Sequence, residues 1–416
     1  MTYSFAAVAI GLVSVCAAPI GVNRGDDQPP PPVPVSTCPA GTAPAGPSAS
    51  PVTGCGALSP RPCDLHAPVV DRVSTDSTLT TLFSRYAATT PDGWTGGDST
   101  FSVRMPDGRI LWLFSDTFLG PLNKNGTRPA NAHLVNNSFV VQAGSQLTTV
   151  VGGAPGQPVA IMPRPDPDHW YWLGDGQIVG GQIQVIFQEY QLADAAHGDL
   201  AFDRNVVATF SPTDLTKPVS VEPLPSLSGV AWGAALLPAS RSGDGYTYIY
   251  GVGGAAPGSK AMRVARVRGD DVRQRPWWFY TPSGWTREER LAANVLPAIA
   301  NEYSVTPWHG MFLLITQDST EDFSNRIVAM TSCAPWGPFT KPKLVYRMPE
   351  SGADGIYHDN GVIAYNAHVH AELSGGNTFL VSYNVHNIQS LYALYNDPTI
   401  YRPRFVRVTL KWANPA

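Results

Sequence analysis

The sequence is poor in charged residues, which make up 14% of its 416 positions and leave a formal net charge of −4. There is no basic excess with which to attract nucleic acid or an anionic membrane surface, so we expect neither as a partner. The chain also lacks a GxSxG elbow, a P-loop and a dinucleotide-binding GxGxxG turn. This argues against serine hydrolase, NTPase and NAD chemistry, and we expect no cofactor.

Long apolar runs are missing as well. The stretch from Phe5 to Ala18 is too short to cross a bilayer but fits the apolar region of a secretory signal. We therefore expect residues 1–25 to be a signal peptide, the mature protein to be secreted or on the cell surface, and no transmembrane segment to be present. Lipid modification at Cys16 is an alternative, although Val15 stands where a lipoprotein signal has a small residue.

Cysteine is scarce, and no CxxC pair occurs, so we expect no structural zinc and no other metal. Removal of the signal leaves Cys38, Cys55, Cys63 and Cys333, an even number in an exported chain, which predicts two disulfides with three alternative pairings. One bridge would join the early cysteines to each other, and another would tie this segment to the loop at Cys333.

Residues 26–64 contain mostly proline, alanine, glycine and serine, including the run QPPPPVPVST. Such a composition cannot bury enough apolar surface to fold alone and predicts an extended linker. We place the folded domain at residues 65–416.

The whole chain contains 39 glycines and 39 prolines. Within the predicted domain, apolar residues alternate with polar ones in short runs. The pattern predicts short strands separated by turns, and the best helix candidate, residues 287–297, is short enough to be a turn. Five similar hairpins begin at about residues 98, 174, 232, 301 and 366. Since one such unit cannot bury itself alone, the repeat predicts an all-β fold, a five-bladed β-propeller, with a β-sandwich as the alternative.

In an antiparallel hairpin, the residue before the first strand and the residue after the second strand share one edge of the sheet. If the hairpins form the inner strands of the blades, these residues face one axial funnel. Acids crowded there raise each other's pKa, which allows one to remain protonated as a general acid while another is ionised. We predict that the catalytic residues are Asp98, Asp116, Asp175 and Glu302.

Other end residues and nearby aromatic rings predict substrate contacts. Flat rings stack on the apolar faces of sugars, while amides, acids and imidazoles bind the hydroxyls. His368 and His370 could instead hold an ion together, but an HxH pair without a third ligand is a weak metal motif. The predicted substrate-binding residues are Trp94, Trp172, Glu189, Trp232, Tyr303, Asp318, His368, His370 and Asn384.

The stretches GWTGGDSTFSVRMPDGRILWLFSDTFLGP, WYWLGDG, NEYSVT and YNAHVHAEL resemble a group of secreted actinobacterial propellers catalogued as domains of unknown function. That group is similar to the five-bladed furanosidases, the arabinanases and levanases, and some of its members are assigned as endo-D-arabinanases. The resemblance implies an acidic set of Asp98, Asp175 and Glu302. Asp116, in the SDTF element shared with the arabinanase-assigned relatives, competes with Asp175 for a catalytic role.

Together these features predict a monomeric, secreted glycoside hydrolase that cleaves furanosidic linkages of a polysaccharide, with arabinan as the expected substrate. The alternative is a propeller that binds carbohydrate without cleaving it. The two differ in geometry, because an enzyme needs paired carboxyl groups on an open funnel, whereas a binding protein can leave its acids dispersed in turns.

Overall fold

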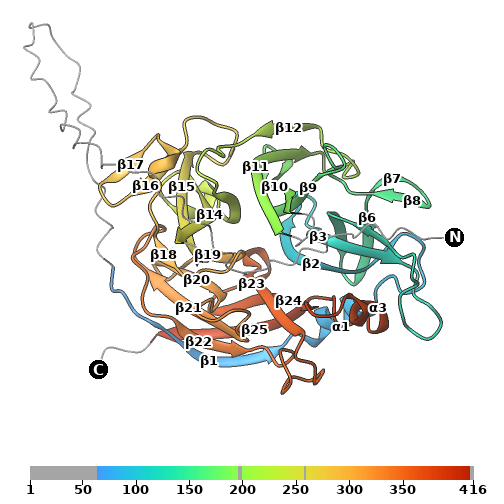
Figure 1. The fold of residues 1–416 in the computed structure, drawn as a ribbon. Coiled ribbons are helices and arrows are strands. Elements are labelled where there is room, and N and C mark those ends of the chain that lie inside the picture. Colours follow the sequence, from blue (N-terminus) through green and yellow to red (C-terminus); the bar gives the residue numbers. More distant parts are fainter. Residues whose placement is uncertain (1–62, 195–198, 257–258, 413–416) are drawn as a thin grey trace, which may run out of the picture.

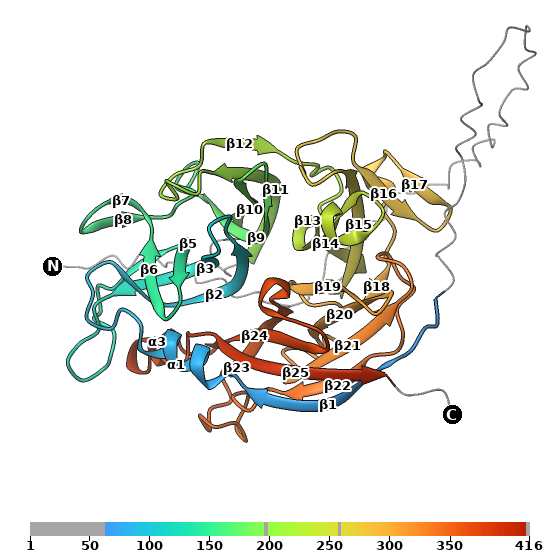
Figure 2. The same cartoon turned by 180° about the vertical axis from the view of Figure 1, so that it is seen from behind.

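The computed structural model describes residues 63–194, 199–256 and 259–412, and all statements below concern these residues. Five sheets of four or more strands lie around one axis like the blades of a propeller, as Figures 1 and 2 show from opposite sides. The predicted five-bladed β-propeller is therefore confirmed. The predicted signal peptide, Cys16 and nearly all of the linker lie outside the described residues.

The inner strand of each blade is the first strand of a predicted hairpin, and these inner strands contact one another around the axis. Blade I consists of β2 (Gly93–Arg104), β3 (Ile110–Gly120), β5 (Ser138–Ala143) and β6 (Gln146–Val150), with β4 (His133–Val135) beside β3. Blade II consists of β9 (His169–Val179), β10 (Gln182–Asp194), β11 (Asp199–Phe210) and β12 (Ser220–Pro223).

Blades III and IV follow in the same order from the axis outward. Blade III contains β13 (Ala231–Leu237), β14 (Tyr246–Ala256), β15 (Ser259–Arg268), β16 (Trp278–Thr281) and β17 (Gly284–Thr286), with β18 (Leu296–Pro297) beside β15. Blade IV contains β19 (Tyr303–Trp308), β20 (Met311–Gln317), β21 (Arg326–Ser332) and β22 (Lys343–Arg347).

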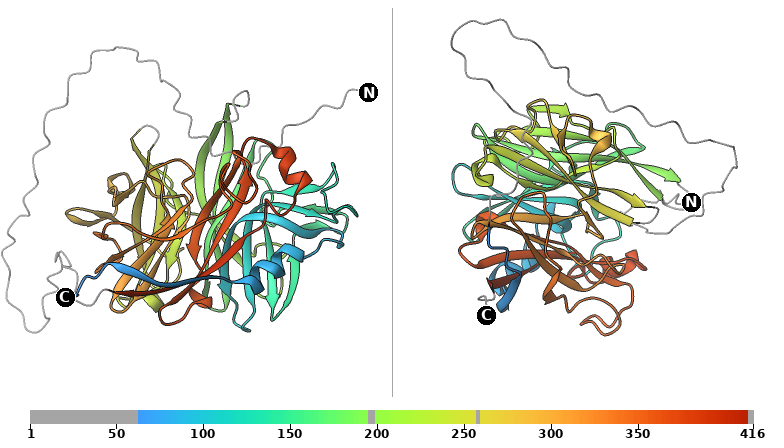
Figure 3. Two further views of the ribbon diagram at one scale, coloured as in Figure 1. Left: turned by 90° about the horizontal axis from the view of Figure 1, so that it is seen from below. Right: turned by 90° about the vertical axis from the view of Figure 1, so that its left-hand side faces the viewer.

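Blade V closes the ring with strands from both ends of the domain. Its inner strands are β23 (Val362–Val369), β24 (Thr378–Asn387) and β25 (Arg404–Trp412), and its outer strand is β1 (Pro68–Thr75), which pairs antiparallel with β25. In Figure 3 (left) the blue β1 runs alongside the red end of the chain. The hydrogen bonds of β1 thus join the first and last parts of the propeller.

Helices are few and peripheral. They are α1 (Ser77–Arg85), α2 (Ala239–Ser242), α3 (Leu391–Asn396) and two 3₁₀ turns, η1 (Glu289–Leu291) and η2 (Ala371–Leu373); a small hairpin, β7 (Gly152–Ala154) with β8 (Gln157–Val159), lies beside blade I. The sequence analysis missed α1, which begins where the Asp76 side chain accepts a hydrogen bond from the backbone N–H of Leu79. No helix of the described residues is long and apolar enough to cross a membrane.

A disulfide joins Cys63, just before β1, to Cys333, just after β21. It connects the start of blade V to blade IV and agrees with the expected tie between the early segment and the Cys333 loop. Cys38 and Cys55 lie outside the described residues, so their pairing stays a prediction.

Candidate active site

A cavity of about 320 Å³ lies on the axis, and its walls come from all five blades or the loops beside them. Asp98 and Glu302 are the two carboxyl groups that line it, together with Ser99, Ser115 and Trp172. Two of the four acids predicted to be catalytic therefore face one cavity. Asp116 lies directly behind Asp98, and Asp175 lies elsewhere on the axis, as described below.

A break in the β2–β3 ladder brings Asp98 and Asp116 together. Gly97 pairs with Thr117, and Ser99 pairs with Phe114. Asp98 on one strand and Ser115 and Asp116 on the other therefore lie between these two paired positions and are themselves unpaired in the ladder. The sequence analysis expected the two acids at the ends of their strands. They lie instead at the middle of their strands. The hairpin is longer than predicted, and the acids still meet because they are on opposite sides of this irregularity.

The backbone after Asp98 is in an unusual conformation. Ser99 and Thr100 have φ angles of 67° and 66°, in the left-handed region that residues other than glycine rarely adopt. Asn384 supports this segment, because its side-chain N–H₂ donates to the Thr100 hydroxyl at 2.8 Å. Such strained conformations persist where the surrounding structure holds them, and here they turn the Asp98 side chain toward the axis.

Asp98 is in a setting that favours its neutral form. Its pKa is raised well above the usual value, first because the carboxyl is buried and second because the charge of Asp116 is close. The Tyr365 hydroxyl donates to Oδ2 at 2.8 Å and opposes this effect, as does the nearby Tyr401 hydroxyl. A carboxyl group held neutral beside a cavity is suited to donate a proton.

Asp116 is buried and accepts hydrogen bonds from two side chains. The residue is 2% exposed, and its Oδ1 accepts hydrogen bonds from the side-chain N–H₂ of Asn136 and the indole N–H of Trp172, both at 2.9 Å. Donors of this kind stabilise a carboxylate. Trp172, predicted to contact substrate, therefore lines the cavity and also holds Asp116.

Glu302 immediately precedes β19 and is 7% exposed. Burial raises its pKa, and the nearby His368 opposes the shift. The ring Nδ1 of His368 lies 3.4 Å from Glu302 Oε2 and 3.1 Å from the carbonyl oxygen of Asn366, while Nε2 lies 3.3 Å from the carbonyl oxygen of Thr100. Carbonyl oxygens only accept, so the ring N–H of His368 donates to the backbone, and the ring lies beside the Glu302 carboxyl group.

A second cavity, of about 300 Å³, lies farther along the axis. Phe101 lines both cavities, and His368, which stacks on it with ring centroids 4.5 Å apart, lines the second. Asp175 lines the second cavity together with Glu372. The structure does not bring Asp175 together with Asp98, Asp116 and Glu302.

Asp175 is bound by backbone groups of two blades. Its Oδ1 accepts from the N–H of Gly176 and its Oδ2 from the N–H of Leu236, both at 2.8 Å, and burial raises its pKa to about 7. A ladder irregularity in β9 opposite β10 turns this segment. His370 also points away from the first cavity, since its Nδ1 bonds the Ser102 hydroxyl at 2.5 Å, and burial lowers its pKa well below the usual value.

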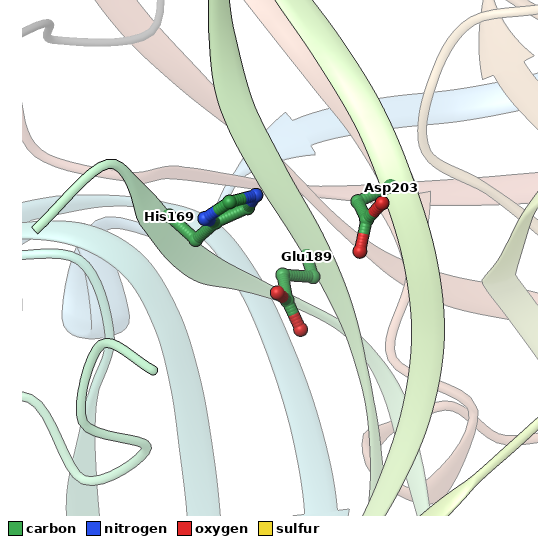
Figure 4. A group of neighbouring side chains, drawn as sticks. All are labelled: His169, Glu189 and Asp203. Atoms are coloured by element: carbon green, nitrogen blue, oxygen red, sulfur yellow. The ribbon is translucent and has the colours of Figure 1, made fainter. Parts of the chain in front are cut away.

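Glu189 lies in blade II, away from the axial cavities. Figure 4 shows it between His169 and Asp203, where one ligand atom from each lies within 4.8 Å of the others. Arg204 already occupies the Glu189 carboxylate, with Nε and Nη2 donating to its two oxygens at 2.7 and 3.2 Å, and His169 pairs with Asp166 at 2.9 Å. This cluster is therefore explained by ion pairs.

Four more predicted substrate contacts have partners within the fold. Trp94 is fully buried beside Phe83, and Trp232 is fully buried with its indole N–H donating to Glu289 at 3.1 Å. The Tyr303 hydroxyl donates to the carbonyl oxygen of Gly251 at 3.0 Å. Asp318 follows β20 and bonds Thr320 and Arg326, as an aspartate at a turn commonly does.

Two residues of the site were missed by the sequence analysis. Tyr365, which donates to Asp98, is the first residue of the YNAHVH stretch, and Asn136, which donates to Asp116, comes from NNSF. Both stretches were noticed, the first for its histidines and the second as an outer strand. The tyrosine could have been found from its place next to a predicted axial strand.

The comparisons with known proteins agree with this fold. The family model described as "Domain of unknown function (DUF5005)" matches residues 76–412, most of the chain. The chain belongs to this family. The DUF5005 domain therefore begins at the residue that caps α1 and ends with β25, and it includes all five blades except the outer strand β1.

The solved structures that are similar to this chain share a low sequence identity with it. A protein from Bacteroides ovatus ATCC 8483, named as a candidate hydrolase, is similar with a TM-score of 0.67 and 24% identity over 84% of this chain and 97% of that chain. The GH43_1 enzyme from Xanthomonas citri complexed with xylotriose is similar with a TM-score of 0.43 and 15% identity over 81% of this chain and 96% of that chain. The sequence matches none of the curated proteins with which it was compared.

Proposed function

We propose that this DUF5005 protein is a secreted glycoside hydrolase that cleaves furanosidic linkages within a polysaccharide, with arabinan as the first substrate to test. The observation that carries the proposal is the pairing of Asp98 with Asp116 beside a cavity that Glu302 also lines. Glycosidic cleavage needs one neutral and one ionised carboxyl group, and the raised pKa of Asp98 supports the neutral role for this acid. The choice of furanosidic linkages rests on the resemblance in sequence.

In this mechanism Asp98 is the general acid. Its proton passes to the glycosidic oxygen as the bond to C1 breaks, and the leaving sugar departs as an alcohol. Asp116, positioned by Asn136 and Trp172, raises the pKa of Asp98 and so keeps the proton on Asp98 until substrate arrives.

Glu302 faces the same cavity and is the carboxylate that acts at C1, either by direct attack or by taking a proton from the attacking water. His368 then acts as a positioning residue, because its ring holds Glu302 and also bonds the backbone beside Asp98. The two cavity acids and the group that orients one of them thus come from blades I, IV and V.

The experiment measures release of oligosaccharides from arabinan, arabinogalactan and a panel of other furanose polymers by the purified protein. Asp98→Asn and Asp116→Asn should each lower release by about 10²–10⁴-fold, because an amide neither donates the proton nor carries the charge. Asp107→Asn is the matched control, since Asp107 lies in the exposed turn of the same hairpin, paired with Arg109.

No release from any polymer would contradict the proposal and favour a propeller that binds carbohydrate without cleaving it. Release that survives both substitutions would reject the assigned acids. To separate the roles of the carboxylates, Glu302→Gly and Asp116→Gly are assayed with azide, and recovery of activity by Asp116→Gly instead of Glu302→Gly would move the action at C1 to Asp116.

A further inference from the structure

The mouth of the first cavity has two unlike walls. On the blade II side, Tyr190, Leu200 and Phe202 line the cavity with partly exposed apolar side chains. These residues belong to the long β10–β11 hairpin, whose green strands rise above the neighbouring blades in Figure 3 (left). This wall is higher than the ring around it and largely apolar.

The aromatic rings of this wall form a row that starts at the acids. The Trp172 indole donates to Asp116, its ring centroid lies 4.7 Å from that of Tyr190, and the Tyr190 centroid lies 5.9 Å from that of Phe202. Tyr190 and Phe202 are directly opposite each other in the β10–β11 ladder, so the row crosses the strands from the axis outward. Rows of rings are suited to bind successive sugar units by their apolar faces.

The facing wall, in blade III, is lined by Val252, Gly253 and Gly254 of β14. A Cβ added to Gly254 would meet no atom within 4 Å, so no neighbour in the described fold requires glycine there, and its φ is not in the left-handed region. Glycine weakens the interior of a strand and is common where a ligand approaches the backbone closely. The absence of a side chain at Gly254 leaves the space between the walls open.

Beyond β14 the cavity is bounded by Lys260 and Asn301, whose side chains bond each other at 2.8 Å. Lys260 is the one cation among the described residues lining this cavity, and the Asn301 oxygen accepts its hydrogen bond. The walls away from the acids therefore present rings, aliphatic groups, backbone and one paired ammonium group. This lining fits a neutral, hydroxyl-rich chain.

We propose that this slot, between Tyr190, Leu200 and Phe202 on one side and Gly253 and Gly254 on the other, binds the sugar units of a neutral polysaccharide next to the bond that is cleaved. The proposal rests on the proposed function for the identity of the ligand. The slot runs outward from the acids, so it binds units of the chain other than the one being attacked.

The test measures binding, so that it does not depend on cleavage. In the Asp98→Asn background, affinity electrophoresis in gels containing arabinan or arabinogalactan, followed by calorimetry with the oligosaccharides of the polymer that retards the protein, gives the dissociation constant. Phe202→Ala should weaken binding by about tenfold, the loss expected for one stacking ring. Gly254→Leu should weaken it at least as much, because the new side chain fills the slot.

Phe312→Ala and Gly375→Leu are the matched controls. Phe312 is a half-buried ring of blade IV, and Gly375 is a blade V glycine at which an added Cβ also meets nothing within 4 Å; neither lines the cavity. Both controls should bind like Asp98→Asn alone, and thermal melting of every variant shows that the fold is retained.

Equal binding by Phe202→Ala, Gly254→Leu and the two controls would overturn the slot, as would the absence of binding to every polymer. Failure of the slot can be distinguished from failure of the proposed function. If the wild-type protein releases nothing from a polymer that it binds through Phe202 and Gly254, the slot stands and the hydrolase assignment falls.

Discussion

The two ends of the axis contain similar residues in different bonding environments. At one end, the side-chain carboxyl of Asp98 faces the hydroxyl groups of Tyr365 and Tyr401 and has Asp116 beside it. At the other end, both oxygens of Asp175 accept hydrogen bonds from backbone N–H groups. A buried acid near the axis is thus not sufficient for a catalytic assignment, because the partners of its oxygens decide whether it can exchange a proton with a substrate.

The largest expected effect is on activity and tests this contrast directly. Asp98→Asn should lower the rate of polymer cleavage by about 10²–10⁴-fold, whereas Asp175→Asn should change it by less than about threefold, because Asp175 faces a separate cavity. Rates are measured on whichever polymer the wild-type protein cleaves. A loss in Asp175→Asn as large as that in Asp98→Asn would break the comparison and restore the acidic set implied by the furanosidase resemblance.

The next effect is on the pH dependence of cleavage. The Tyr365 hydroxyl stabilises the ionised form of Asp98, so Tyr365→Phe should raise the pKa of Asp98 still further. The general acid must be protonated, and therefore the alkaline limb of the rate profile should move to higher pH, by about one unit for the loss of one hydrogen bond to a charged group.

Tyr86→Phe is the control for this shift. Its hydroxyl bonds Thr149 at 2.9 Å, outside the cavity, and the profile should not move. A shift of the alkaline limb to lower pH in Tyr365→Phe would mean that Asp98 is not the proton donor.

The fold was predictable because the hairpins repeat. Alternating apolar residues and turns placed the five inner hairpins, and a unit that cannot bury itself required the ring. Antiparallel pairing also brought Asp98 and Asp116 together in the prediction, and they are neighbours, although at mid-strand. Helix α1 was missed because its one clear signal, the capping Asp76, is a short polar residue of the kind that also marks turns.

The division of the axis into two cavities was not predictable in the same way. It depends on ladder irregularities next to Asp98 and Asp175, and on positive φ angles at Ser99 and Thr100. Irregularities of this kind at glycine can be expected from sequence, but serine and threonine adopt them only under the constraint of the finished fold.

The smallest expected effect is on stability, and it concerns Asp175. Its pKa is raised to about 7 by burial, so between about pH 4 and pH 7 the folded protein binds more protons at this site than the unfolded chain does. The free energy of unfolding should therefore decrease as the pH rises through this window, by at most about 1.4 kcal/mol per pH unit from this one group. Asp175→Asn removes the titration and should flatten that part of the profile.

Asp318→Asn is the matched control, because the pKa of Asp318 is shifted in the opposite direction from that of Asp175. Burial acts to raise the Asp318 pKa, but bonds from Thr320 and Arg326 prevail and lower it, so its contribution to stability is present above its usual pKa and is lost as the pH falls further. Urea unfolding from pH 4 to pH 7 should thus separate Asp175→Asn from both the wild-type protein and Asp318→Asn. An unchanged slope in Asp175→Asn would mean that its two backbone hydrogen bonds keep it ionised throughout, which would make the far end of the axis a fixed charge that does not titrate in this range.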